Sequence, residues 1–351
     1  MPQNILILDC TNADYNGASI DQSPTGGIAL VTVRLAEQLA TVGMNVCVRN
    51  HTCVPITHKN VRWENVSSLK ELARPDIILA SNDVNLFAPY DEWIRQGSRP
   101  ILWIHNLVTW KRIFKKHRLG NLIKYRPESV FLSEYHLKSC APFVPLGRKY
   151  IIPHAVDDGF FDVEGAGRSG VQSRAQKLPQ ALFLSKAFRG FGAVLKLWMR
   201  DIHPHAPRAM LRAYIGRDEL PNLGVSEDDL RTHNIHILDR APQKILRDEM
   251  AASSCLIYPG HKDETFCNVA AESTVLGLPI VTMGIGALNE RARNGAGIVA
   301  KTDQDLAKIM VDLFQNPLKI QQLSQNALAA REQYRWSTRI KDWMELFQQS
   351  R

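Results

Sequence analysis

The 351-residue sequence lacks the patterns that mark several large classes of protein. Its six cysteines form no C-x-x-C pair and show no His/Cys spacing typical of zinc, which predicts reduced thiols in a cytosolic protein. We find no secretory signal and no apolar stretch long enough for a transmembrane segment. A disulfide framework, a zinc site and an integral membrane protein are therefore not expected.

Dinucleotide and nucleic-acid binding are also disfavoured. The G-x-G-x-x-G fingerprint is absent, which argues against a dehydrogenase. No helix-turn-helix, RNA-binding or zinc motif is present, so no nucleic-acid partner is expected. The formal net charge is nevertheless +8, and residues 1–155 hold 18 Lys and Arg against 12 Asp and Glu. The first half of the chain is therefore expected to face something acidic.

Short apolar runs alternate with helical patterns along the chain. In the first half the runs are at 5–8, 46–48, 75–80, 100–105, 130–136 and 150–157, and in the second at 181–184, 208–216, 235–238, 254–258 and 278–282. This rhythm predicts an α/β fold with parallel sheets covered on both faces, and the length allows two cores. The Gly, Ser, Gln and Arg in residues 162–177 indicate a hinge, which predicts domains 1–160 and 161–334.

Two glutamates stand out in the second half. Glu264 follows the predicted strand 254–258, at the edge where open α/β sheets bind ligands. Glu272 is eight residues later, so both carboxylates could project from one edge of a single helix. Such a pair suits a polyhydroxyl ligand, because carboxylates accept hydrogen bonds from vicinal hydroxyls. The alternative is that Glu264 only favours a helix start and that Glu272 lies on a solvated face.

Other candidate residues lie in loops at predicted strand ends. Gly26 and Gly27 open the first helix, where backbone N–H groups can approach a phosphate, although two glycines also simply make a turn. His105 ends the strand 100–105 and could contact a sugar hydroxyl, although a lone histidine is more often structural. Lys186 and Arg189 follow the strand 181–184 and are placed to clamp a diphosphate, although either alone is more often solvated.

Residues 110–126 contain seven Lys or Arg, no acid, and interleaved large apolar side chains. That composition is typical of a surface segment attracted to anionic lipid or to a phosphorylated acceptor. The alternative is a solvated basic helix.

Together these residues resemble the retaining glycosyltransferases of GT-B fold, family 4. The family signature E-x-F-G-x-x-x-x-E fits Glu264, Phe266 and Glu272, with Cys267 where glycine is usual and Asn268 after it. Gly26 and Gly27 are similar to the family's first-loop glycine pair. Residues 152–157 resemble its I-P-N-G-V-D element with two departures, and residues 286–290 resemble G-G-x-x-E. The resemblance covers most of the chain.

The resemblance implies two Rossmann-like domains facing each other across a cleft, with a C-terminal helix, residues 335–351, packing back on the first. It implies that Glu264 and His105 contact the donor sugar and that Glu272 contacts the ribose. It also implies that Lys186 and Arg189 hold the diphosphate. Phe266, Cys267 and Asn268 fall in the same donor site. The basic pair departs from the family's G-R-x-x-x-x-K-G in spacing and in order.

The predicted activity is therefore transfer of a sugar, with retention, from a nucleotide-diphosphate sugar to an acceptor hydroxyl, with no cofactor and no metal. The acceptor is expected to be a glycan or a lipid-linked molecule in bacterial surface polysaccharide synthesis, and the protein to be cytoplasmic or peripheral on the inner face of the membrane. Two alternatives are a sugar-nucleotide epimerase of the same fold and a non-catalytic protein that binds a sugar-nucleotide or a polyanion.

Overall fold

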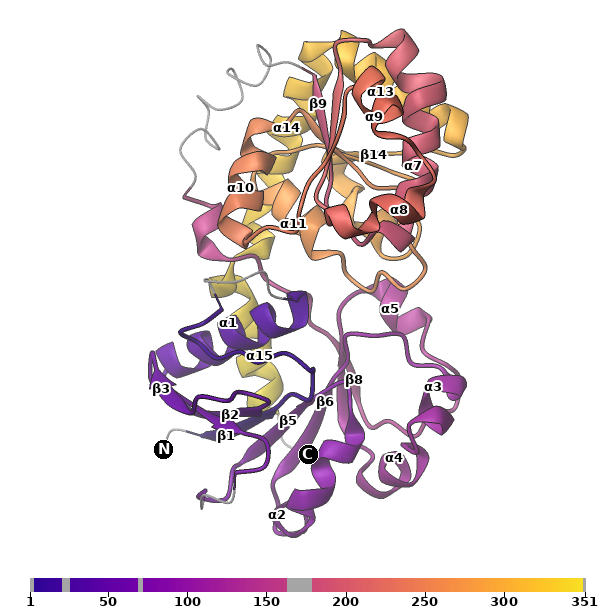
Figure 1. The fold of residues 1–351 in the computed structure, drawn as a ribbon. Coiled ribbons are helices and arrows are strands. Elements are labelled where there is room, and N and C mark those ends of the chain that lie inside the picture. The colour runs from indigo at the N-terminus through magenta and orange to yellow at the C-terminus, as the bar shows by residue number, and fades with distance from the viewer. Residues whose placement is uncertain (1–2, 21–25, 69–71, 163–178, 350–351) are drawn as a thin grey trace. The chain divides into compact units, whose positions relative to one another are not determined.

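The computed structural model describes residues 3–20, 26–68, 72–162 and 179–349. The chain divides into two compact units, of which unit 1 is residues 1–154 with 336–351 and unit 2 is residues 155–335 (Figure 1). Each unit carries its own largely parallel sheet, which confirms the predicted α/β class. The division after residue 154 precedes the predicted boundary at 160/161, and residues 163–177 of the predicted hinge lie outside the described ranges.

Unit 1 is built on a sheet with the strand order β3-β4-β2-β1-β5-β6-β7-β8, in which the β3–β4 pair alone is antiparallel among the described strands. The strands are β1 (Asn4–Leu8), β2 (Asn45–Asn50), β3 (Ile56–His58), β4 (Val61–Asn65), β5 (Ile77–Ser81), β6 (Arg99–Trp103), β7 (Glu128–Phe131) and β8 (Lys149–Ile151). The helices are α1 (Gly27–Thr41), the 3-10 helix η1 (Val84–Tyr90), α2 (Asp91–Arg95), α3 (Trp110–Lys115), α4 (Leu119–Tyr125), α5 (Glu134–Lys138) and α15 (Trp336–Gln348).

Alternate residues of the central strands of unit 1 face opposite sides of the sheet. Leu6, Ile78 and Leu102 pack with Ile113 and Leu122, which places α3 and α4 over one face. On β6, Trp103 instead meets Trp343 of α15 edge-on, with ring centroids 5.3 Å apart. The continuous apolar strands predicted from the sequence are therefore buried from both sides.

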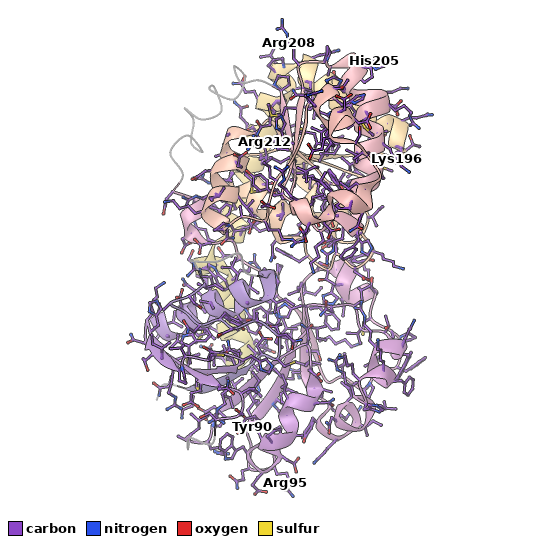
Figure 2. All side chains as sticks on the ribbon, viewed as in Figure 1. Tyr90, Arg95, Lys196, His205, Arg208 and Arg212 are labelled. Atoms are coloured by element: carbon purple, nitrogen blue, oxygen red, sulfur yellow. The ribbon has the colours of Figure 1, made fainter. Side chains whose placement is uncertain are left out.

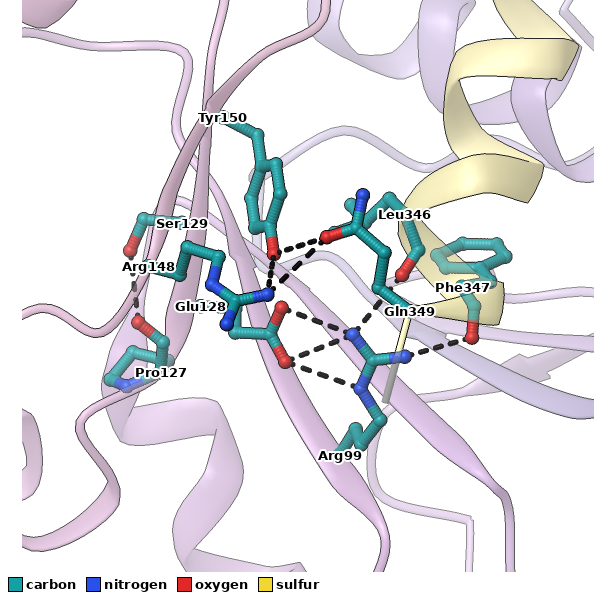
Figure 3. A network of polar contacts seen from close by, with 9 residues as sticks. All are labelled: Arg99, Pro127, Glu128, Ser129, Arg148, Tyr150, Leu346, Phe347 and Gln349. Carbon is teal, nitrogen blue, oxygen red and sulfur yellow. Dashed lines mark hydrogen bonds and ion pairs between the residues drawn. The ribbon is translucent and has the colours of Figure 1, made fainter. Parts of the chain in front are cut away.

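The C-terminal helix α15 belongs to unit 1 and is fixed there by Arg99 of β6 (Figure 3). Nη2 of Arg99 donates to both carboxylate oxygens of Glu128, at 2.9 and 3.0 Å. The same guanidinium donates to the carbonyl oxygens of Phe347 and Leu346, at 2.8 and 3.1 Å. Arg99 therefore satisfies carbonyls that a helix C-terminus leaves without an intrahelical partner, and it adds a positive charge where the helix dipole favours one.

Unit 2 is built on a parallel sheet with the order β11-β10-β9-β12-β13-β14. The strands are β9 (Gln180–Phe183), β10 (Met210–Ala213), β11 (Ile235–Ile237), β12 (Cys255–Ile257), β13 (Ile280–Thr282) and β14 (Gly297–Val299). The α-helices are α7 (Phe191–Leu197), α8 (Leu220–Leu223), α9 (Glu227–Thr232), α10 (Gln243–Ala252), α11 (Asn268–Val275), α12 (Leu288–Arg291), α13 (Asp303–Gln315) and α14 (Pro317–Ala330). Shorter turns are η2 (Asp158–Phe160), η3 (Ala187–Arg189), the π-turn η4 (Trp198–Ile202), η5 (His203–His205), η6 (Arg217–Glu219), η7 (Arg293–Gly295) and η8 (Arg331–Tyr334).

Charged side chains of unit 2 point to solvent, as Figure 2 shows at Lys196 and Arg208, both of which are exposed. Arg212 of β10, by contrast, is only partly exposed and pairs with Glu249 of α10 at 2.9 Å. The charged side chains are thus mostly kept out of the core, and the partly buried one has an acidic partner, as its desolvation requires.

We predict that Arg99→Met destabilises unit 1 by about 2 kcal/mol, because Glu128 and two helix carbonyls lose a charged donor. Urea unfolding followed by tryptophan fluorescence and by proteolysis of each unit measures the effect. Arg99→Lys, which keeps the charge but not the fork, is expected to recover part of the loss. Equal loss of stability in both units, or none in either, would contradict a local role for Arg99.

Candidate functional site

Glu264 lies in the loop after β12, and one of its carboxylate oxygens is held by two donors of unit 2. Its side chain is 8% exposed. Oε1 accepts a hydrogen bond from Nη1 of Arg189 and another from the Tyr258 hydroxyl, the latter at 2.9 Å. Burial and the nearby Cys267 raise the pKa of Tyr258 well above its usual value, so the phenol stays protonated and donates. The second oxygen, Oε2, receives no hydrogen bond from the described part of the chain.

Arg189 is only partly used by this contact. It sits in the short helix η3, which follows β9, and its side chain is 28% exposed. Its Nε is buried and has no acceptor among the described residues. Because a buried donor without an acceptor is costly, an anion beside Arg189 would be stabilised there.

The backbone of Glu264 is locked by a glycine in a second loop. Gly286 has φ +73°, and a Cβ built on it would lie 2.5 Å from the carbonyl oxygen of His261 and 2.8 Å from that of Glu264. The amide of Ala287 donates to the Glu264 carbonyl at 2.9 Å. A side chain at 286 would push the two loops apart, so the glycine of the G-x-x-x-E element sets the position of Glu264.

The prediction that Glu264 and Glu272 share one helix is wrong. Helix α11 begins at Asn268, and Glu264 lies in the preceding loop. The reason is Cys267, which takes the left-handed conformation with φ +69° at the N-cap position and therefore cannot be part of a right-handed helix. Glycine, usual in the family at this position, takes that conformation without strain. Burial raises the pKa of the Cys267 thiol to about 12.

Glu272 lies on the first turns of α11 and is bound by a residue of α10. Its Oε1 accepts a hydrogen bond from Nε2 of Gln243 at 2.9 Å. Burial raises the pKa of Glu272 to about 7, the Gln243 donor opposes that shift, and the charge of Asp157 adds to it. Glu272 therefore changes charge close to neutral pH, and the solvated-face alternative does not describe it.

The remaining second-half candidates surround this loop. Phe266 is buried, with the Arg291 guanidinium 4.6 Å above its ring, and Asn268 begins α11. Lys186 is exposed at the N-cap of η3 and makes no ion pair within the described residues. The structure thus separates the basic pair, with Arg189 on Glu264 and Lys186 facing solvent.

His105 belongs to unit 1 and is buried just beyond β6. Its Nδ1 lies 3.1 Å from Nε2 of His154, and its backbone amide donates to Oδ1 of Asn82 at 2.8 Å. Its ring packs on Trp103, with centroids 4.4 Å apart. Burial, and then the charges of His154 and His136, hold the pKa of His105 well below its usual value. His105 is therefore neutral at physiological pH.

Gly26 and Gly27 are exposed at the start of α1, as expected from the sequence. Gly26 has φ −66°, so its own backbone does not require glycine, and nothing within 4 Å would meet a Cβ built on it. Helix α1 has no side-chain cap and no acidic residue in its first turn. Within the described residues, neither a cap side chain nor a first-turn carboxylate accepts from its first amides.

No group of three metal-ligating side chains is found in the described ranges. Asp303 and Asp305 form a D-x-D triplet, but Asp305 accepts a hydrogen bond from the Lys301 amide at 2.8 Å at the start of α13. That triplet is thus part of a helix cap. The activity without a metal therefore stays a prediction.

Sequence reasoning missed the residues that hold the candidates in place: Tyr258, Gln243, Arg291 and His154. Tyr258 ends the apolar run of β12, and a polar side chain at that end of a strand was a usable signal. Gln243, Arg291 and His154 act from elements distant in sequence, and no local pattern reveals such contacts.

Comparison with known proteins gives a family match for part of the chain and a fold for all of it. Residues 196–316 match the family model described as glycosyl transferases group 1. The sucrose-phosphate synthase of Thermosynechococcus elongatus superposes with a TM-score of 0.74 at 14% identity, covering 98% of both chains. WaaG, a glycosyltransferase involved in lipopolysaccharide biosynthesis, superposes with a TM-score of 0.68 at 14% identity, covering 98% of this chain and 100% of that one.

A third similar structure is Anabaena HepE in complex with UDP and glucose, with a TM-score of 0.69 at 14% identity over 98% of this chain and 99% of that one. No curated protein sequence matches the chain. The predicted GT-B fold is thereby confirmed. The predicted resemblance to glycosyltransferases is supported by the match to residues 196–316, which include Glu264 and Glu272.

We predict that Glu272 makes stability depend on pH. Because the folded-state pKa is about 7 and the ordinary value 4.5, the folded state holds this proton more tightly, and stability falls as pH rises from about 4.5 to 7. The loss is no more than about 3 kcal/mol. Glu272→Gln has no group that titrates at this position and therefore does not lose this stability. The difference in melting temperature between Glu272→Gln and wild type should rise from pH 4.5 to about 7. Glu227→Gln, at an exposed position of unit 2, is the control; a difference between Glu272→Gln and wild type that does not change with pH would contradict the assignment.

Proposed function

We propose that the protein is a retaining glycosyltransferase that moves a sugar from a nucleotide-diphosphate sugar to an acceptor hydroxyl. The observation that carries the proposal is the Glu264 carboxylate, with Oε1 held by Arg189 and Tyr258 and Oε2 left for a ligand. A fixed carboxylate oxygen in an edge loop suits a hydroxyl of the donor sugar. The family match to residues 196–316 supports the same activity.

The proposed donor site uses the other residues of unit 2 in distinct roles. Glu272 accepts hydrogen bonds from the ribose hydroxyls, and the buried Nε of Arg189 together with Lys186 binds the diphosphate. Phe266, Cys267 and Asn268 form the wall at the start of α11. UDP and glucose are the ligands named for HepE, which makes a uridine nucleotide the first donor to test. From unit 1, the proposal assigns the start of α1 at Gly26 and Gly27 to a phosphate, and neutral His105 to a sugar hydroxyl.

The proposed chemistry places no carboxylate as a base. The bond between the sugar carbon and the diphosphate oxygen breaks, a bond from the same carbon to the acceptor oxygen forms on the same face, and the acceptor proton passes to the departing phosphate. Arg189 stabilises the negative charge that develops on that phosphate. Glu264 is engaged with two donors, so its role is to position the sugar. No metal takes part in this proposal.

We further propose that the acceptor is a glycan or lipid-linked molecule of bacterial surface polysaccharide synthesis, and that the enzyme works on the cytoplasmic face of a membrane. None of the helices in the described ranges is long and apolar enough to cross a bilayer. Instead, Phe114, Ile123 and Phe143 are exposed apolar side chains of unit 1, with Phe143 95% exposed. Lys111, Lys115 and Lys116 are also exposed, on and beside α3, and make no ion pair in the described part of the chain.

The activity is tested first by a thermal-shift screen of UDP, GDP and ADP with their common sugars, because a ligand raises the stability of the state that binds it. With the donor identified, Glu264→Gln is expected to lower turnover about 100-fold and to leave the shift caused by the nucleoside diphosphate intact. Glu272→Gln should weaken that shift. The exposed Glu227→Gln serves as the matched control.

The outcomes separate the alternatives. Product that forms only when an acceptor is present indicates a transferase, whereas an isomerised free sugar indicates an epimerase. No turnover by the wild type with any donor would favour a non-catalytic binding protein. Full activity of Glu264→Gln would refute the role given to Glu264.

Membrane binding is tested by co-sedimentation with vesicles. We expect binding to vesicles with anionic lipid and loss of roughly 1 kcal/mol for each of Lys111, Lys115 and Lys116 changed to Gln, because each contributes to the same surface charge. Arg118 is left unchanged because it pairs with Asp83 at 2.9 Å. Equal binding to neutral vesicles would exclude an electrostatic attachment.

A further inference from the structure

A cavity of about 420 Å³ lies in unit 1 between the sheet and helices α3 and α4. Its apolar lining comes from β6, the loop after it, η1, both helices and the loop before β8. It consists of Val84, Leu102, Ile104, Leu107, Val108, Ile113, Leu122 and Leu146. The volume falls in the range of about 300 to 1,000 Å³ that is usual for small-molecule sites. Part of the hydrophobic core of unit 1 is therefore accessible to a ligand.

The lining of this cavity is positively charged. It includes Arg112, Lys115, Lys116 and Arg118, and no acidic residue is among the lining residues. Arg118 is neutralised by Asp83 at 2.9 Å, and Nη1 of Arg112 donates to the Leu107 carbonyl at 3.1 Å. Lys115 and Lys116 make no ion pair within the described ranges. At least two lysine charges thus remain available beside an apolar interior.

The cavity is also linked to the candidate residue His105. Ile104 and Asn106, the residues on either side of His105, both line it. Asn82, another lining residue, accepts hydrogen bonds through Oδ1 from the amides of His105 and Asn106, at 2.8 and 3.1 Å. An occupant of the cavity therefore touches the segment that carries His105.

We propose that this cavity binds an amphiphile in which a hydrocarbon chain is joined to a phosphate, and that such a lipid-linked phosphate is the acceptor class of the enzyme. The apolar lining takes the first part of the chain, and Lys115 and Lys116 bind the phosphate. Two lysine charges suit a multiply charged phosphate better than a single carboxylate, because the phosphate carries more charge and offers more acceptor oxygens. The second half of this proposal rests on the proposed glycosyltransferase activity, whereas binding itself does not.

The test is isothermal titration calorimetry of the full chain with decyl phosphate below its micelle concentration, with no nucleotide present. Decyl phosphate is expected to bind. Decanoate and inorganic phosphate should bind at least tenfold more weakly, because decanoate lacks the phosphate group and inorganic phosphate lacks the hydrocarbon chain. Lys115→Gln and Lys116→Gln should each raise the Kd several-fold. Val108→Trp, which fills the cavity, should abolish binding.

Lys111→Gln is the matched control, because Lys111 is on the same helix, α3, but does not line the cavity. It should leave the Kd for decyl phosphate unchanged while weakening vesicle binding as much as Lys115→Gln does. If Lys111→Gln and Lys115→Gln weakened the binding of decyl phosphate equally, general surface charge would explain the binding, and the proposal would be overturned. So would decanoate or inorganic phosphate binding as tightly as decyl phosphate. If Val108→Trp fails to fold, the lysine variants alone decide the outcome.

The two proposals fail separately. Binding of decyl phosphate without turnover of any nucleotide-sugar would keep the cavity as a ligand site and reject it as an acceptor site. Turnover with acceptors that lack a phosphate-linked chain, without binding of decyl phosphate, would keep the transferase and reject this cavity.

Discussion

The contact between Arg189 and Glu264 is the interaction on which the candidate site of unit 2 depends. It joins the loop after β9 to the loop after β12, and the Tyr258 hydroxyl, directly after β12, is the second donor to the same oxygen. The loop with Gly286 then fixes the Glu264 backbone from the other side. Three loops at the carboxyl edge of one parallel sheet are thereby held together by a single residue, through its carboxylate and its backbone carbonyl. Because these donors fix one oxygen only, the residue is rigid and still able to bind a ligand.

The two candidate carboxylates of unit 2 have partners of different charge. Glu264 faces a guanidinium, whereas Glu272 faces the neutral amide of Gln243. A neutral donor offsets the cost of burial only in part, which is why the pKa of Glu272 rises to about 7. A ligand whose hydroxyls donate hydrogen bonds to Glu272 would favour the charged form of that carboxylate.

The sequence predicted the elements whose signals are local. The apolar runs of β1, β5, β6 and β12 were found because parallel strands buried on both faces are continuously hydrophobic. The position of Glu264 at a strand end followed from the same pattern. The helix start was predicted too early, because a left-handed Cys267 interrupts a stretch with helical spacing. Strands β3 and β4, with exposed or charged residues at alternate positions, gave no such run and were missed. Contacts such as His105 with His154 depend on tertiary packing, which spacing does not encode.

The attachment of α15 to β6 also constrains how the chain is made. Arg99 binds carbonyls of residues 346 and 347, so strand β6 is completed by a segment that is synthesised much later than the strand itself. Domains usually fold in order as they emerge from the ribosome. Here unit 1 is complete only after unit 2, residues 155–335, has been synthesised, because residues 336–351 belong to unit 1. Until then Trp103 lacks its ring contact with Trp343, and this part of the sheet is without the helix that covers it in the folded unit.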